Sequence, residues 1–125
     1  MTEQKTVSSL LDFEAIRRAV EDLDAELLAS TYAEDVEASF VGRGAPPSSP
    51  HEQSGKQEIM ETHRRVFKED IRQHIENEVI GKDRVAFTVP AVYTDGKHEL
   101  CAVFLDLNEE GKVIRQMIVQ ARDEE

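Results

Sequence analysis

Apolar residues recur at intervals of three and four in the first part of the chain. This spacing puts them on one side of an α-helix and predicts an amphipathic helix over residues 9–23. The stripe consists of Phe13, Ile16, Val20, Leu23 and Leu27. The same spacing continues through Leu28 and Tyr32, which predicts a second short helix, or a bent continuation of the first, that ends near Ala33.

The middle of the chain changes character twice. Residues 35–42 favour a strand and end at a glycine. Residues 43–54 hold three of the four prolines and have no periodicity, so they are predicted to form a loop, either a lid over a site or a mobile decoration. Ser54 and Gln57 form a capping-box pattern ahead of a third amphipathic helix. The apolar face of that helix contains Ile59, Met60, His63, Val66 and Phe67.

The last part of the chain has the composition of strands. Residues 71–80, 84–93, 98–108 and 112–122 are separated by short turns that contain glycine, which predicts an antiparallel meander of four strands. The later strands carry apolar residues on both faces. We therefore expect the sheet to be covered on both sides, by the helices on one and by a second copy of the sheet on the other.

Composition narrows the class of protein. At 125 residues the chain has the size of one domain, and we predict a single α+β domain over residues 1–125. A formal net charge of -11 disfavours nucleic acid and anionic membranes as partners. No apolar run approaches the length of a membrane span, and the first residues lack a signal-peptide core, so a cytoplasmic location is expected. Cys101 is the single cysteine, which excludes an internal disulfide, and no spacing of ligand residues predicts a metal site.

The order of these elements, with local sequence at several points, resembles the nuclear transport factor 2 superfamily. The matching segments are residues 32–35 (YAED), 54–56 (SGK), 72–77 (RQHIEN) and 111–114 (GKVI), and the resemblance covers about residues 9–122. This superfamily includes ketosteroid isomerase, scytalone dehydratase and the SnoaL-like cyclases. The resemblance implies a cone-shaped α+β barrel, with N-terminal helices packed on a strongly curved antiparallel sheet. It also implies a pocket between helices and sheet, and a homodimer formed through the sheet.

The catalytic residues of these relatives are largely missing. The carboxylate base of ketosteroid isomerases matches Ser39 or Phe40, and their two oxyanion donors match Ile16 and Val103. The first pocket histidine of scytalone dehydratase matches His74, and the second falls at about Ala91. Steroid isomerisation by that mechanism is therefore not expected.

A mostly apolar pocket with a few polar groups remains as the candidate site. The resemblance takes Phe87, Val89 and Val103 as inward-facing, and strand alternation then adds Cys101 to the same side. The predicted pocket residues are Ile16, Val20, Tyr32, Ser39, Phe40, Phe87, Val89, Cys101, Val103, Gln116, Ile118 and Gln120.

His63 and His74 are the predicted acid/base groups, because an imidazole can move a proton near neutral pH. The alternative for His63 is a histidine at the edge of the core, satisfied by a backbone carbonyl. His74 alternates with Arg72 and Glu76, which favours the solvent-exposed face of the strand. Only the family resemblance predicts that its side chain points into the pocket.

The functional hypothesis is a SnoaL-like enzyme of the isomerase, cyclase or dehydratase type. It would act without a cofactor on a hydrophobic cyclic or polyketide-like molecule. The alternatives are a non-catalytic domain that binds a small molecule, and a dimerisation domain whose interior is filled by its own side chains.

Overall fold

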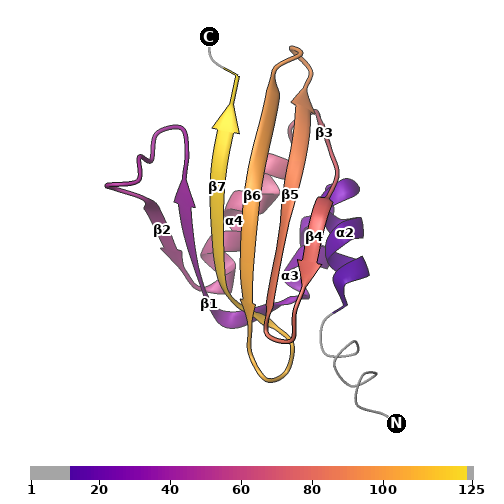
Figure 1. The fold of residues 1–125 in the computed structure, drawn as a ribbon, viewed down its shortest axis with the longest axis vertical. Helices are drawn as coiled ribbons and strands as arrows, with labels where there is room; N and C mark the ends of the chain where they lie inside the picture. Colours follow the sequence, from indigo (N-terminus) through magenta and orange to yellow (C-terminus); the bar gives the residue numbers. More distant parts are fainter. Residues whose placement is uncertain (1–11, 124–125) are drawn as a thin grey trace.

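The computed structural model describes residues 12–123 as a few helices and a large curved sheet, an α+β fold (Figure 1). The helices are α2 (Phe13–Glu21), α3 (Ala25–Ala29) and α4 (Lys56–Phe67). The strands are β1 (Tyr32–Val41), β2 (His51–Ser54), β3 (Ile71–Gln73), β4 (Glu76–Ile80), β5 (Arg84–Tyr93), β6 (His98–Leu107) and β7 (Val113–Arg122). Residues 9–11 of the first predicted helix lie outside the described part.

Helices α2 and α3 begin where aspartates accept hydrogen bonds from backbone N–H groups that have no partner within the helix. Asp12 Oδ1 accepts from the backbone N of Ala15 at 3.1 Å, and Asp24 Oδ1 accepts from that of Leu27 at 3.0 Å. Leu23, with a φ of 57°, lies in the left-handed region between them. The predicted bend after the first helix is thus a break that separates α2 from α3.

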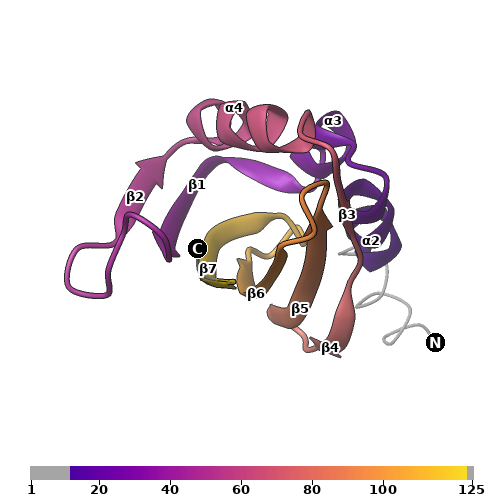
Figure 2. The same ribbon diagram turned by 90° about the horizontal axis from the view of Figure 1, so that it is seen from above.

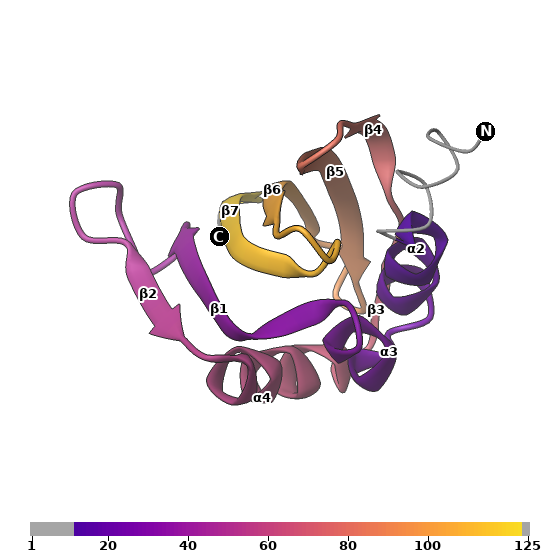
Figure 3. The same ribbon diagram turned by 90° about the horizontal axis from the view of Figure 1, so that it is seen from below.

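The sheet is mixed, whereas the family resemblance implied an antiparallel sheet. Its order is β2-β1-β7-β6-β5-β3, with β4 also pairing with β5. The β5, β6 and β7 strands form the predicted antiparallel meander, but β1 pairs with β7 in parallel. The crossover through α4 and the meander brings β7 back beside β1 in the same direction. The sheet is curved without closing into a barrel (Figures 2 and 3).

Three predicted boundaries were wrong. Tyr32 opens β1 and does not end the second helix, which stops at Ala29. The predicted loop 43–54 contains β2, which forms a hairpin with β1. The capping box does not form, because Gly55 occupies the cap position of α4 with a φ of 92°. Glu58 Oε1 instead accepts a hydrogen bond from the backbone N of Ser54 at 3.1 Å.

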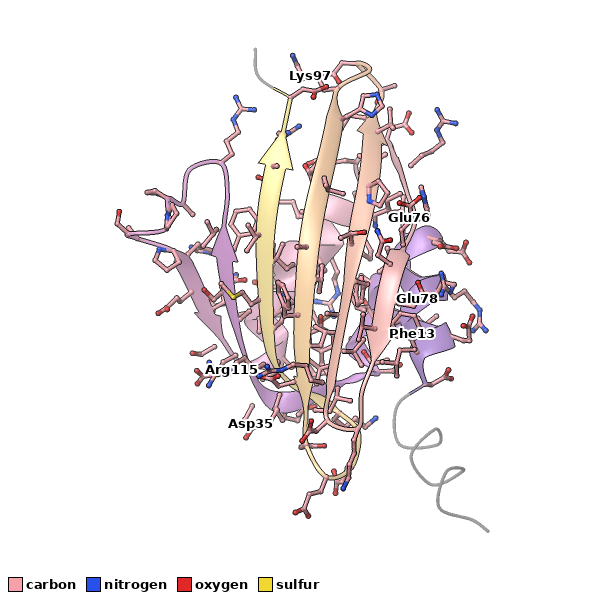
Figure 4. The ribbon with its side chains drawn as sticks, in the orientation of Figure 1. Phe13, Asp35, Glu76, Glu78, Lys97 and Arg115 are labelled. Carbon is pink, nitrogen blue, oxygen red and sulfur yellow. The ribbon has the colours of Figure 1, made fainter. Side chains whose placement is uncertain are left out.

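The predicted strand 71–80 divides into β3 and β4 around Ile75. The side chains of α2 replace the lost strand partners there, since Glu21 Oε2 accepts from the backbone N of Ile75 at 3.2 Å and Arg17 Nη1 donates to its carbonyl at 3.4 Å. Arg17 Nη2 also donates to Glu78 Oε2 of β4 at 2.6 Å, which joins helix and sheet. Figure 4 labels Glu78 on this strand. Ile75 is consequently buried in the core.

Alternation along β5, β6 and β7 divides the sheet into two faces. We call the face that carries Val85, Phe87, Val103, Leu105 and Gln116 the inner face, and all of these side chains are buried. The helices lie along this side of the curved sheet (Figures 2 and 3). The rings of Phe13 on α2 and Phe87 on β5, for instance, meet edge to face at 5.7 Å.

The outer face retains exposed apolar side chains. Leu100 and Phe104 of β6 lie there with Met117 and Val119 of β7. We call these four residues the outer patch. Within residues 12–123, no helix combines the length and apolar character needed to cross a membrane.

Two valines of the described sheet provide a matched test of the two environments. Val85 on β5 is 0% exposed and Val79 on β4 is 67% exposed. We expect Val85→Ala to lower the free energy of unfolding by about 2–3 kcal/mol, through lost burial plus a cavity. Val79→Ala is expected to change it by less than about 0.5 kcal/mol. Urea unfolding of both variants measures this, and equal losses would contradict the assignment of the inner face.

Candidate functional site

Three polar side chains from three elements meet beside the core, where Tyr32 and Gln116 are buried and His63 is half-buried. Tyr32 comes from the start of β1, His63 from α4 and Gln116 from the inner face of β7. The Tyr32 hydroxyl donates a hydrogen bond to Gln116 Oε1. The His63 ring meets the Tyr32 ring edge to face at 6.4 Å and is tilted against Phe67 at 5.7 Å. We call Tyr32, His63 and Gln116 the interior cluster.

The sequence places these groups together through simple local rules. Gln116 points inward because it alternates with Arg115 and Met117, which are exposed. His63 lies on α4 four residues after Ile59, on the side that faces the core. Gln116 and Tyr32 are only 5% and 3% exposed, so each polar atom needs a partner in the interior, and the hydrogen bond between them supplies one.

Burial keeps the interior cluster uncharged. It lowers the pKa of His63 from 6.5 to about 4, although a hydrogen bond with the Gln116 side chain acts in the opposite direction. Burial also raises the pKa of Tyr32 far above its ordinary value. At neutral pH the cluster therefore presents a phenol, an amide and a neutral imidazole, all of which can hydrogen bond and only one of which readily accepts a proton.

Most of the apolar residues predicted to line a pocket lie in the same hydrophobic core as Tyr32. Ile16 and Val20 of α2 are buried, as are Phe87, Val89 and Val103 of the sheet. Cys101 and Ile118 are partly buried against the same core. Phe40 shares their face, because it pairs in parallel register with Ile118.

Two further pocket predictions have different outcomes. Gln120 lies on the inner face and its Oε1 accepts from the backbone N of Arg43 at 3.1 Å, so it fixes the start of the loop after β1. Ser39 pairs with Met117, on the outer face. The structure therefore does not bring Ser39 to the interior cluster.

His74 also lies apart from the interior cluster. Its side chain is 54% exposed, and its Nε2 is 2.8 Å from Glu76 Oε2. Alternation around the buried Ile75 turns the ring to the solvent side, as the sequence pattern alone had favoured. His74 borders a surface groove of about 360 Å³, lined by Arg72, Gln73, His74, Pro90, Ala91, Val92 and His98.

A second polar group lies on the inner face, and the sequence analysis missed two of its members, Glu99 and Arg122. Tyr93, Glu99, Cys101 and Arg122 gather where β5 ends, β6 begins and β7 ends, and we call them the rim cluster. Tyr93 donates its hydroxyl to Glu99 Oε1 at 3.0 Å, and Cys101 Sγ donates to Glu99 Oε2 at 3.4 Å. The alternation that placed Cys101 and Gln120 inward, extended by one step on each strand, would have found Glu99 and Arg122.

The Tyr93 phenol and the Cys101 thiol of the rim cluster stay protonated at neutral pH. Burial, followed by the neighbouring Glu99 charge, raises the pKa of Cys101 to about 12. The same two causes raise the pKa of Tyr93 far above its ordinary value. Cys101 is therefore a thiol and not a nucleophilic thiolate at neutral pH. Among residues 12–123, no three side chains of His, Cys, Asp or Glu gather in a way that would hold a metal ion.

Comparison of the structure with solved proteins shows a consistent likeness. An NTF2-like protein of unknown function from Mesorhizobium loti aligns with a TM-score of 0.78 and 12% identity, over 97% of this chain and 95% of the other. A steroid delta-isomerase from Pseudomonas aeruginosa aligns with a TM-score of 0.69 and 8% identity, over 92% and 79%. A SnoaL-like protein of unknown function from Burkholderia thailandensis aligns with a TM-score of 0.68 and 18% identity, over 90% and 95%.

The chain has the nuclear transport factor 2-like fold. No family model matches the sequence, and no curated protein is significantly similar to it. At these identities the likeness establishes the fold and leaves the activity open. The function of this NTF2-like domain must therefore be argued from its own interior.

The lowered pKa of His63 makes stability depend on pH. Because the folded pKa lies below the unfolded value of 6.5, the unfolded chain takes up the proton first as the pH falls. The contribution of His63 to the free energy of unfolding is fully present above about pH 6.5 and decreases as the pH falls towards about 4. Between pH 7 and pH 5 we expect a loss of about 2 kcal/mol from His63.

Urea unfolding at several pH values measures this loss. His63→Phe keeps the ring contacts and should remove about 2 kcal/mol of the pH dependence over that interval. His98→Gln alters an exposed histidine and serves as the matched control. An unchanged pH profile in His63→Phe would show that the ring is not buried in its neutral form.

Proposed function

We propose that this NTF2-like domain binds a hydrophobic cyclic molecule against its inner face and acts on it as an isomerase, cyclase or dehydratase. The observation that carries the proposal is the interior cluster. Three sequence-distant polar side chains, two of them buried and His63 half-buried, converge at the edge of an otherwise apolar core, which is the composition of a small-molecule site. A steroid delta-isomerase shares this fold, which is compatible with the proposed class of chemistry, while the likeness itself establishes the fold alone.

His63 is the proton-transfer group in this proposal. Its neutral ring can take a proton from a carbon or oxygen of the ligand and return it at another position, so no co-reactant is needed. The imidazolium formed in between is disfavoured by burial, which speeds the return of the proton, and the Gln116 side chain stabilises it through their hydrogen bond. Tyr32 and Gln116 orient a ligand oxygen.

The second candidate is a binding domain without catalysis. It is favoured by the interior hydrogen bond: the Tyr32 hydroxyl donates to Gln116 and would have to exchange this partner before it could orient a ligand oxygen. In addition, the positions that match the catalytic residues of ketosteroid isomerases hold Ile16, Ser39 or Phe40, and Val103, none of which supplies a carboxylic acid or a phenol.

Proton transfer at carbon separates the two candidates. A panel of cyclic ketones can be screened for binding by thermal shift, and then for exchange of their α-protons with deuterium by NMR. We expect the wild-type protein to catalyse exchange in a ketone that binds, and His63→Phe to reduce the rate by about 10²-fold or more. Tyr32→Phe should weaken binding by up to about tenfold, the worth of one hydrogen bond.

The control is His98→Gln, which should exchange at the wild-type rate. Binding with no exchange above the buffer rate would support the non-catalytic candidate. Exchange that persists in His63→Phe would remove His63 from the mechanism.

We also propose that the outer patch pairs with a second copy of the chain. Its four large apolar side chains lie side by side on β6 and β7, and each is 38–49% exposed. Contiguous apolar surface of this kind usually marks a contact with another protein surface. A sheet face also repeats its own geometry in a copy related by a two-fold axis.

Substitution of the patch tests the dimer. The wild-type protein is expected to have twice the 14.1 kDa mass of one chain by light scattering. Phe104→Glu should shift the mass to that of one chain, because it buries an unpaired charge in the interface. Val79→Glu, at an exposed position outside the patch, should leave the dimer intact. A wild-type monomer, or a dimer that resists Phe104→Glu, would contradict the proposal.

A further inference from the structure

The rim cluster contains a cation, Arg122, with one buried hydrogen-bond donor that has no acceptor among the described residues. Arg122 Nε is buried and has no hydrogen-bond partner within residues 12–123. The guanidinium carbon lies 4.6 Å from the centre of the Tyr93 ring, so the group is stacked on an aromatic face. Buried N–H groups in folded proteins are nearly always paired, and an unpaired one calls for an acceptor.

Glu99 forms an ion pair with Arg122 but does not accept a hydrogen bond from its Nε–H. Its Oε1 is 3.7 Å from Arg122 Nε, beyond hydrogen-bond distance. Both carboxylate oxygens already accept, one from Tyr93 and the other from Cys101. The Glu99 side chain is only 11% exposed, so little water reaches the carboxylate. Arg122 is thus fixed in position while its Nε–H remains available.

We propose that the rim cluster is a binding subsite for an uncharged oxygen of the ligand, such as a ketone, ester or lactone carbonyl. That oxygen accepts a hydrogen bond from Arg122 Nε–H. The inference rests on the proposed function, since it requires the apolar body of a ligand to lie along the inner face beside Val103 and Ile118.

The charges of the rim cluster decide against a carboxylate ligand. Arg122 and Glu99 have opposite charges at a separation of 3.7 Å and nearly cancel at the distance of a bound group. An anion would gain electrostatic binding free energy from attraction to Arg122 and lose a similar amount through repulsion by Glu99. A carbonyl oxygen meets no such repulsion and still satisfies the buried N–H.

The subsite is distinct from the interior cluster. Gln116 and Arg122 are six residues apart on β7, which corresponds to about 20 Å along a strand. A small bicyclic probe cannot reach both. Variants at the two places therefore report on different contacts.

The test compares three naphthalenes by isothermal titration calorimetry. 2-Acetylnaphthalene has a carbonyl, 2-ethylnaphthalene has the same shape without it, and 2-naphthoate has a carboxylate. We expect the wild-type protein to prefer the ketone to the ethyl compound by about tenfold, the worth of one hydrogen bond from a charged donor. Arg122→Met, which keeps much of the apolar stem, should abolish this preference.

Because Arg122→Met leaves Glu99 unpaired, the double variant Glu99→Gln/Arg122→Met serves as a second test that buries no lone charge. It should lose the ketone preference as well. Arg115→Met, an exposed arginine on the same strand, should retain it (Figure 4). His63→Phe should retain it too, since His63 belongs to the interior cluster.

Glu99→Gln provides a gain-of-function test. It leaves the Arg122 charge uncompensated, so affinity for 2-naphthoate should rise by about tenfold or more while the ketone still binds. A ketone preference that survives Arg122→Met, or 2-naphthoate binding that is indifferent to Glu99→Gln, would overturn the subsite. A preference abolished only by His63→Phe would overturn it and still support the proposed function. Failure of all three compounds to bind would overturn both.

Discussion

The alternation of side chains along β5, β6 and β7 is the constraint on which the rest of this structure depends. A strand points successive residues to opposite faces, so one shift in register would move Val103, Leu105 and Gln116 to the outer side. Their burial holds the register, because the apolar members of the inner face must be covered by the helices. Once the register is set, Gln116 can only point into the core. The polar interior follows from the packing of its apolar neighbours.

The helices and the meander could be predicted from local sequence patterns, whereas the pairing of β1 and the break between β3 and β4 could not. Periodicity identified α2 and α4, and glycine-bearing turns identified the meander, because both signals are local. The parallel pairing of β1 with β7 and the division of residues 71–80 around Ile75 are tertiary effects. The second depends on Arg17 and Glu21 of α2, more than 50 residues away, which take over the hydrogen bonds of the Ile75 backbone. No local pattern in residues 71–80 contains that information.

The same contrast applies to the candidate site. Alternation placed Gln116, Ile118 and Gln120 on one face, and resemblance to a family added Tyr32 and His63 as pocket residues. The hydrogen bond from Tyr32 to Gln116 was beyond the sequence, because it joins residues whose proximity depends on the curvature of the whole sheet. Resemblance also suggested an inward place for Ser39 and His74, whereas both lie on the solvent side. Glu99 and Arg122 were missed because the alternation was not followed to the ends of the strands.

Burial without charge is the central electrostatic feature of the interior cluster. A neutral imidazole in this place can accept a proton and is not committed to an ion pair. NMR of the imidazole nitrogens, recorded on the free protein near pH 5.5, tests this account most directly. The account predicts that His63 gives the signals of a neutral ring, in keeping with a pKa of about 4. An imidazolium spectrum for His63 at that pH would contradict it, because the ring would then be exposed to water or paired with an anion, and not buried beside Tyr32 and Gln116.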